Sequence, residues 1–310
     1  MKLTVAICTW NRADLLDKTL AGMRELLPPP SGAWELLVID NNSTDGTKAV
    51  VARHESALPL RYVFEPKQGH SNARNAGIEA ATGDLLIWTD DDVIVDPRWL
   101  IEYAAAADAF PDAAFFGGTI DPWFAVAPPG WVVRNLPTLH GPFAIRQLGD
   151  DVRRLRDDEL VFGASLAFRA PLLKEHRFNP DLGRKGTGML SGDETDLLAR
   201  LRALGHYGVW VGTAKVRHYI PADRLTTRYV WRFFHGLGRT TQRLGPLDRD
   251  GTPRVFGAPR WMVRKYVAAR AKMALHRVGR GPAWMEAFRD AAVARGIIDE
   301  CRANPTPAGA

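Results

Sequence analysis

The 310-residue sequence has only two cysteines, Cys8 and Cys301, which stand nearly a whole chain apart. This scarcity excludes a disulfide framework and is typical of a reducing compartment. The sequence also lacks an apolar run long enough to span a bilayer. No signal-peptide pattern opens it, because Met1 and Lys2 lead directly into a strand-like run. These absences predict a cytoplasmic protein, with peripheral contact at the inner face of the membrane as a second possibility.

Acidic residues are scarce toward the end of the chain. Residues 221–296 contain 16 Lys and Arg against 5 Asp and Glu, whereas residues 1–220 contain 24 against 28. The net charge of +6 therefore originates in the C-terminal quarter. Such a basic surface suits nucleic acid, an anionic membrane or phosphorylated ligands. No nucleic-acid recognition motif accompanies the charge, so we expect no nucleic-acid partner.

Short apolar runs alternate with amphipathic segments in the first half, as in a parallel sheet covered by helices. The pattern predicts strands at residues 3–9, 35–40, 60–64, 84–89, 113–120, 160–168 and 208–216. It predicts helices at residues 13–27, 47–56, 71–81, 97–110, 194–204, 225–244, 261–278 and 284–295. We therefore expect an α/β domain over residues 1–220, a basic helical extension over 221–298 and a disordered tail over 299–310. Residues 121–159 show no clear period and are expected to form a functional loop or a disordered one.

Three aspartates, Asp90, Asp91 and Asp92, follow the apolar run at residues 85–89. A buried strand that ends in three carboxylates gathers negative charge, which a cation must compensate. Asp90 and Asp92 share a face of extended backbone, and their oxygen atoms suit Mg²⁺ or Mn²⁺. A solvated acidic loop is the simpler alternative for such a triplet. Polar clusters also follow the first strand, at residues 9–12, and the second, at residues 40–43. Ligands of open α/β sheets bind beyond the carboxyl ends of the strands, so these clusters predict one shared site.

Four segments carry a resemblance to a known family: residues 7–12, 38–45, 69–77 and 86–92. Together they resemble family 2 glycosyltransferases of the GT-A fold, over roughly residues 1–220. The resemblance implies that Thr9, Asn11, Asp40 and Arg74 contact the nucleotide. It also implies that Asp90 and Asp91 line the donor sugar and that Asp92 holds a metal, Mn²⁺ or Mg²⁺, on the diphosphate. A metal between carboxylates and diphosphate would neutralise the charge that develops on the leaving group.

A second acidic cluster, at residues 193–196, opens a predicted helix. Acidic residues at this position are often caps favoured by the helix dipole. Inverting members of the resembled family carry Glu-Asp here, the second residue being the general base. This chain has the reverse order, Asp193 then Glu194, so position favours Glu194 as the base and residue type favours Asp193. We take Glu194 as the base, Asp193 as the alternate, and expect Asp196 to pair with Arg200.

Two further residues receive roles, His218 from the same resemblance and Trp131 from its place in the aromatic-containing segment 121–159. His218 falls where several members of the fold place a histidine near the metal and diphosphate, although a histidine at a strand end is often structural. Trp131 offers a flat apolar face to a sugar or lipid-like acceptor. The small residues at 163–165 would let a sugar approach the backbone closely.

The basic C-terminal helices have two interpretations. They either pack on the catalytic domain or form an interfacial amphipathic helix around Trp261 that contacts anionic lipid. Together with the sequence patterns, the resemblance implies a metal-dependent inverting glycosyltransferase that uses a nucleotide diphosphate sugar, with a UDP-sugar favoured. The expected acceptor is a sugar, a lipid-linked compound or a small molecule. One alternative is a sugar-nucleotide-forming nucleotidyltransferase, although residues 9–12 are not the Gly-rich basic loop of that class. The other alternative is a nucleotide-sugar-binding subunit without a base.

Overall fold

The computed structural model describes residues 1–186, 188–245, 252–255 and 257–304. These residues fall into two compact units. The sheet unit holds residues 1–123, 144–186 and 193–219, and the helical unit holds 124–143, 187–192 and 220–310. The boundary predicted from the sequence lies after residue 220, whereas the helical unit also takes in two earlier segments.

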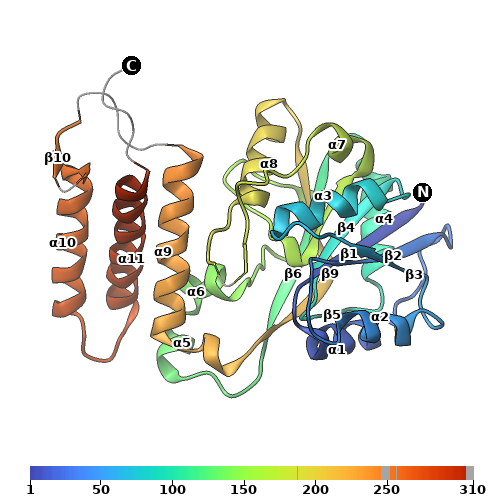
Figure 1. The fold of residues 1–310 in the computed structure, drawn as a ribbon, viewed down its shortest axis with the longest axis horizontal. Coiled ribbons are helices and arrows are strands. Elements are labelled where there is room, and N and C mark those ends of the chain that lie inside the picture. The colour runs from blue at the N-terminus through green and yellow to red at the C-terminus, as the bar shows by residue number, and fades with distance from the viewer. Residues whose placement is uncertain (187, 246–251, 256, 305–310) are drawn as a thin grey trace. The chain divides into compact units, whose positions relative to one another are not determined.

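One mixed sheet organises the sheet unit (Figure 1). Its strands, within the described residues, are β1 (Leu3–Thr9), β2 (Trp34–Asp40), β3 (Leu60–Phe64), β4 (Leu85–Asp90), β5 (Val93–Val95), β6 (Phe115–Phe124), β7 (Val152–Arg154), β8 (Leu166–Arg169) and β9 (Gly208–Ile220). They lie in the order β3-β2-β1-β4-β8-β6-β9-β5, and β7 pairs with β9. The strands β1 to β4 are parallel, whereas β8 joins β4 in antiparallel orientation.

Helices cover both faces of this sheet. The helices α1 (Ala13–Met23), α2 (Thr47–His54) and α4 (Trp99–Ala109) share one core cluster with the strands. The helices α3 (His70–Ala80), α7 (Ala170–Glu175) and α8 (Asp193–Ala203) share the other. Alternation along the strands explains the division, because Leu36 and Val38 face the first cluster and Leu37 and Ile39 the second. The predicted α/β fold is confirmed.

The central part of the chain differs from its prediction. A strand was predicted over residues 160–168, but β8 begins only at Leu166 and a 3-10 turn, η1 (Gly163–Ser165), precedes it. The segment 121–159, predicted as a loop, contains α5 (Gly130–Arg134), α6 (Leu136–Phe143) and β7. These elements are too short for a hydrophobic period to reveal them.

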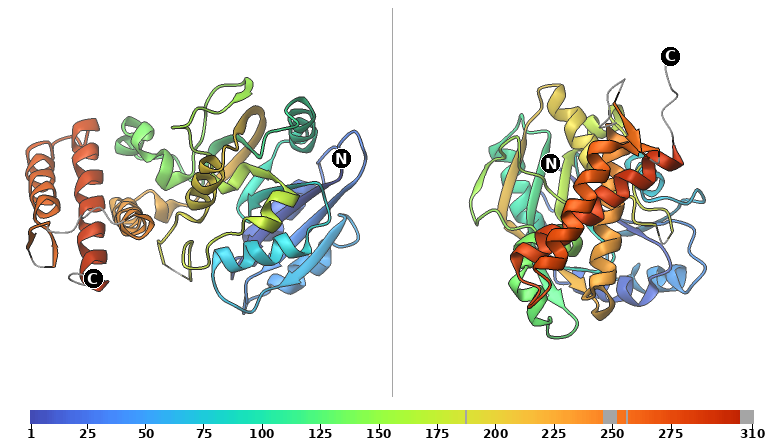
Figure 2. Two further views of the ribbon diagram at one scale, coloured as in Figure 1. Left: turned by 90° about the horizontal axis from the view of Figure 1, so that it is seen from above. Right: turned by 90° about the vertical axis from the view of Figure 1, so that its left-hand side faces the viewer.

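Long helices make up most of the helical unit. They are α9 (Thr227–Leu244), α10 (Arg260–Leu275) and α11 (Pro282–Ala303). The unit also contains a short 3-10 turn, η2 (Ala222–Arg224), and two two-residue strands, β10 (Arg254–Val255) and β11 (Ala258–Pro259). The views of Figure 2 agree that α11, in red, lies between α9 and α10. Glycines set the close approach of α9 and α11, because a Cβ on Gly238 would overlap the backbone of Val293, and one on Gly296 the backbone of His235. None of the helices in the described residues is long and apolar enough to cross a membrane.

The end of α11 corrects one prediction. Residues 299–303 were assigned to a disordered tail, but they form the last turn of this helix. Glu300 and Cys301 are buried there, and Glu300 pairs with Arg239 and Arg243 of α9. These long-range ion pairs are invisible in the sequence. Residues 305–310, the rest of the predicted tail, lie outside the described residues.

Candidate active site

The polar ends of three neighbouring strands meet at one edge of the sheet. β1 lies between β2 and β4, and the register pairs Thr9 with Asp40 and Cys8 with Asp90. The structure therefore brings together the strand-end clusters that the sequence analysis singled out. This edge is where ligands of open α/β sheets bind.

Arg12 compensates part of the charge of the aspartate triplet. Its Nη1 lies 2.6 Å from Asp91 Oδ1 and its Nη2 2.6 Å from Asp92 Oδ2. Asp91 is buried and also accepts a hydrogen bond from Thr9 Oγ1 at 2.8 Å, while its carbonyl accepts one from Thr19. Burial raises the pKa of Asp91 to about 7, against the opposing effect of the Arg12 charge. The side chains of Asp91 and Thr9, both predicted to contact the donor, are thus bonded to each other within the protein.

A possible cation site lies beside this network. Asp90, Asp92 and His218 can each offer a ligand atom, and these atoms lie within 4.8 Å of one another. His218 reaches the triplet because β5 follows the triplet directly and pairs with β9, placing Val93 opposite His218. The distance from His218 Nε2 to Asp92 Oδ1 is 3.4 Å. Two carboxylates and an imidazole form a donor set that suits Mn²⁺ well and Mg²⁺ through its oxygens. The residues therefore fit the predicted metal.

The loops after β1 and β2 are bonded to each other. Asn11 has a positive φ of 52°, and its Oδ1 accepts a hydrogen bond from the backbone of Thr44 at 2.7 Å. The backbone of Asn11 in turn donates to Ser43 Oγ. The buried Asp40 accepts bonds from Ser43 N and Tyr62 Oη, each at 2.8 Å. Burial and the hydrogen bond to Asp40 raise the pKa of Tyr62. The predicted nucleotide residues Asn11 and Asp40 thus belong to a rigid pair of loops.

Arg74 connects α3 to the acidic N-terminus of α8. Its Nη1 donates to Asp193 Oδ2 at 2.9 Å and its Nη2 to Glu194 Oε1 at 2.5 Å. His70 Nδ1 lies 3.3 Å from the same oxygen of Asp193. Gly163 gives this cluster its room, since a Cβ there would overlap both Glu194 and Arg74. The sequence analysis assigned Arg74 to the nucleotide, whereas the structure places its guanidinium on the two candidate bases.

Aromatic rings hold the Arg74 guanidinium in place. The group lies 4.9 Å from the ring centre of Phe178 and 5.8 Å from that of Trp88, and the side chain is 1% exposed. Such stacking and bidentate bonding favour arginine over lysine. No sequence pattern signalled this arrangement, because Arg74 and Glu194 are 120 residues apart.

The environments of the two candidate bases shift their pKa values in opposite directions. Burial would raise the pKa of Asp193, but the Arg74 charge and His70 outweigh it and lower the value. Burial raises the pKa of Glu194, and the neighbouring Asp193 charge adds to this effect, despite Arg74. Glu194 is also more open, with 24% of its side chain exposed against 6% for Asp193. A carboxylate with a raised pKa and access to solvent is the better proton acceptor.

Other predicted residues take simpler places. Asp196 pairs with Arg200 at 2.9 Å as expected. Ser165 is buried and bonded to Trp99 and Tyr103, so its hydroxyl serves the core. Trp131 is half-buried on α5 in the helical unit.

Some curated proteins resemble only part of this chain, and others resemble most of it. The validoxylamine A glucosyltransferase of Streptomyces hygroscopicus subsp. limoneus is 37% identical over 114 residues, or 36% of this chain and 25% of that protein. The chain thus spans about a quarter of the length of this relative. The succinoglycan biosynthesis protein ExoM of Rhizobium meliloti (strain 1021) is 27% identical over 258 residues, or 79% of this chain and 75% of that protein.

Solved structures share the fold. The mannosyltransferase PcManGT from Pyrobaculum calidifontis, in complex with GDP-Man and Mn²⁺, has a TM-score of 0.59 at 19% identity. The match covers 95% of this chain and 86% of that one. TarS 1–349 of S. aureus, in complex with UDP, has a TM-score of 0.58 at 15% identity and covers 97% and 90%. The predicted GT-A fold is confirmed.

The model of the family described as glycosyl transferase family 2 matches residues 4–165. This range runs from β1 through the aspartate triplet to η1 and covers more than half of the chain. The predicted resemblance is therefore confirmed, and the nucleotidyltransferase alternative is set aside. The chain belongs to glycosyl transferase family 2.

Proposed function

We propose that this glycosyltransferase moves a sugar from a UDP-sugar to an acceptor hydroxyl, with inversion at the anomeric carbon and with a divalent cation bound. The observation that carries the proposal is the Arg74-bound carboxylate pair at the start of α8. A catalytic base of raised pKa and a diphosphate site are the two parts that inverting transfer requires.

In the proposed reaction Glu194 accepts the proton of the acceptor hydroxyl. The hydroxyl oxygen then bonds to the anomeric carbon, while the bond from that carbon to the diphosphate oxygen breaks and UDP leaves. Asp193 keeps Arg74 in position and remains ionised, since Arg74 lowers its pKa. Arg74 fixes one oxygen of Glu194, and among the described residues no hydrogen bond occupies the other, Oε2.

Donor recognition would use the loops after β1 and β2. Asp40, bonded to Ser43, and Asn11, bonded to Thr44, are proposed to contact the nucleotide. Asp91, which accepts hydrogen bonds from Thr9 and Arg12, is proposed to hold Arg12 in position. The solved complexes of TarS with UDP-GlcNAc and of PcManGT with GDP-Man show that proteins of this fold bind nucleotide-sugar donors. The favoured donor nucleotide remains UDP.

Asp90, Asp92 and His218 would hold the cation, Mn²⁺ or Mg²⁺. When bound, the cation would neutralise charge on the leaving diphosphate. The Mn²⁺ of the PcManGT complex supports Mn²⁺ as the first ion to test.

The helical unit is proposed to contact anionic lipid at the cytoplasmic membrane face. Residues 260–281 hold seven Lys and Arg and no Asp or Glu. Trp261, Leu275 and Val278 are 43%, 77% and 88% exposed beside these charges, as in an interfacial helix. We expect flotation with vesicles containing phosphatidylglycerol, and a large loss of flotation in Trp261→Ser/Leu275→Ser. Equal flotation of this variant, or equal binding to neutral vesicles, would refute the contact.

Two isosteric variants test the base. Glu194→Gln should lower UDP release from a UDP-sugar by roughly 10²–10⁴-fold while UDP binding persists. Asp193→Asn should reduce the rate less, because it leaves Glu194 ionisable. If Asp193→Asn is inactive and Glu194→Gln is not, Asp193 is the base, whereas full activity of both variants would refute both assignments of the base. A wild-type protein that binds UDP but releases none from a UDP-sugar would support the non-catalytic alternative. The variant Trp131→Ala tests the acceptor side. It should raise the acceptor KM while UDP release from the donor alone stays nearly unchanged.

A further inference from the structure

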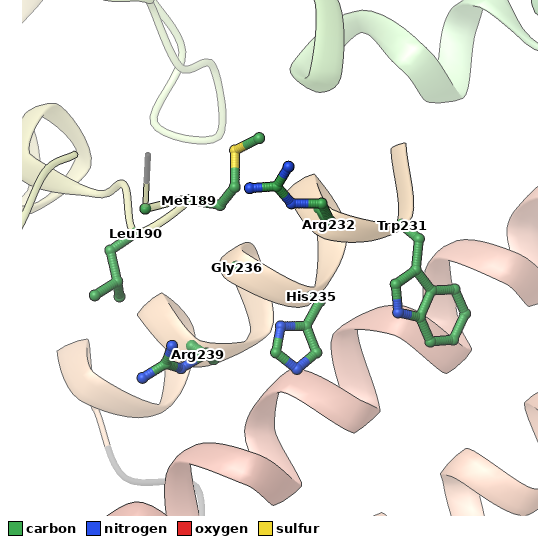
Figure 3. Close-up of a pocket in the computed structure, with 8 residues that line it drawn as sticks. Met189, Leu190, Trp231, Arg232, His235, Gly236 and Arg239 are labelled. Carbon is green, nitrogen blue, oxygen red and sulfur yellow. The ribbon is translucent and has the colours of Figure 1, made fainter. Parts of the chain in front are cut away.

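The helical unit contains a pocket of about 310 Å³ that the reaction above does not use (Figure 3). Besides two glycines, its lining consists of Met189, Leu190, Trp231, Arg232, His235 and Arg239. Among the residues that the structure describes, none that lines the pocket is acidic, and three of the six side chains are basic. An aromatic ring and cationic side chains in one lining are what an anionic ligand with a ring would require.

One face of α9 provides the cations. Arg232, His235 and Arg239 follow one another at intervals of three and four residues, so they line one side of the helix. The segment opposite is fixed to the same helix, because Ser191 N donates to Thr240 Oγ1 at 3.1 Å. Gly236 permits this approach, since a Cβ there would overlap the carbonyl oxygen of Met189. The pocket is thus formed by packing within one unit.

Carboxylates of α11 orient two of the basic groups from behind. Glu300, itself buried, bonds Arg239 Nε at 2.8 Å and Arg243 Nε at 2.5 Å. His235 Nε2 lies 3.0 Å from Asp299 Oδ2. Arg239 uses Nε alone, and its two Nη atoms have no acceptor in the part of the chain that the structure describes. These donors are preorganised for a ligand that brings oxygen acceptors.

The indole of Trp231 is also held in a fixed orientation. Its ring packs edge-to-face on Phe288, with the centroids 5.2 Å apart. A rigid indole loses little conformational entropy when a sugar ring stacks on it. The lining therefore matches a ligand with a sugar ring on one side and an anion on the other.

We propose that this pocket is an acceptor subsite for a saccharide that carries a phosphate group. The guanidinium groups of Arg232 and Arg239 bind the phosphate and Trp231 stacks on the sugar. In the sequence Leu190 stands only four residues before Glu194, so the Cα atoms of these two residues are at most about 14 Å apart. This short connection favours the acceptor over a regulatory ligand, and this assignment rests on the proposed transfer function.

Calorimetric titration tests the binding with glucose 1-phosphate as the probe, compared with glucose and with inorganic phosphate. Glucose 1-phosphate should bind most tightly, and Arg232→Gln should weaken it at least about tenfold. Arg264→Gln on α10, an exposed position outside the lining, removes the same charge and should bind the probe like the wild type. If both variants bind glucose 1-phosphate equally weakly, the binding depends only on the overall positive charge of the helical unit, and the proposal is overturned.

A second measurement tests the acceptor role. Glucose 1-phosphate should change the rate of UDP release from a UDP-sugar, and Arg232→Gln should need at least about tenfold more of it for the same effect. No effect on UDP release at concentrations that saturate the pocket would overturn the role. The pocket would instead be assigned to lipid by a different result. In that case Arg232→Gln would abolish binding to phosphatidylglycerol vesicles, and glucose 1-phosphate would not compete with the vesicles. Failure of the proposed function would be seen separately, as a wild-type protein that releases no UDP, because the titration involves no donor.

Discussion

Replacing Gly163 by alanine adds a single methyl group beside the candidate base. The Cβ of this alanine would overlap Glu194 Oε1 and Arg74 Nη2 and would lie 3.0 Å from Glu194 Cδ. Gly163 lies in η1 with a φ outside the positive range, so the backbone tolerates the change. The overlapping atoms are the ends of side chains, so they can move while the fold persists.

The size of the movement sets the expected effect. To restore even a tight carbon–oxygen contact of about 3 Å, the Glu194 oxygen must move by about 1 Å. A displacement of this size in a reacting group costs about 10²-fold in rate, which equals about 3 kcal/mol of transition-state stabilisation. We expect Gly163→Ala to lower kcat for UDP release by about 10²-fold, with UDP affinity changed less than about threefold.

The assay measures UDP release over a panel of UDP-sugars with Mn²⁺, and calorimetry measures UDP binding. Gly245→Ala is the matched control, because an added Cβ at that position meets no atom within 4 Å. An unchanged kcat in Gly163→Ala would refute the arrangement of Arg74 and Glu194. Parallel loss of turnover and of UDP binding would show instead that the cluster supports the fold.

Two further changes test the cation site and the helical unit. Asp92→Asn should abolish the gain in UDP affinity that Mn²⁺ gives the wild-type protein, with at least about a tenfold loss of metal affinity; equal wild-type UDP affinity in Mn²⁺ and in EDTA would contradict the site. Gly296→Ala should destabilise the helical unit by about 1–3 kcal/mol in chemical denaturation, because the Cβ overlaps the carbonyl of His235 in a packed interface. Gly281→Ala, at a position with open space, is the control, and equal stability of the two variants would show that α9 and α11 do not approach so closely.

The sequence predicted the sheet and its polar edge because both depend on local patterns. Apolar runs of period two and their polar ends are visible residue by residue, and parallel pairing places such ends together. The predicted gathering of residues near Thr9, Asp40 and Asp90 follows from these patterns alone. The elements α5, α6 and β7 gave no comparable signal, since each has at most eight residues, fewer than the window over which a hydrophobic period can be detected.

The partners of buried charges could not be predicted in the same way. Arg12 stands in a strand-end motif, but nothing in the motif indicates that it joins Asp91 and Asp92. Glu300 was placed in a tail, although it forms ion pairs with two arginines of another helix. Each of these pairings satisfies a desolvated charge, and only the folded chain determines which opposite charge is near enough.

Through Arg74, the carboxylates of Asp193 and Glu194 are connected to strand β4. Arg74 binds both carboxylates, and its guanidinium lies on the ring of Trp88. Trp88 is in β4, two residues before Asp90, so the strand that carries the triplet also supports the arginine that holds the base. A shift of this strand would therefore move the candidate cation ligands and the base together. Of the two carboxylates that Arg74 binds, Glu194 is the more exposed, with 24% of its side chain exposed against 6% for Asp193. In the proposed reaction the two residues would divide the work between an ionised carboxylate, Asp193, that orients Arg74 and a more basic one, Glu194, that accepts a proton.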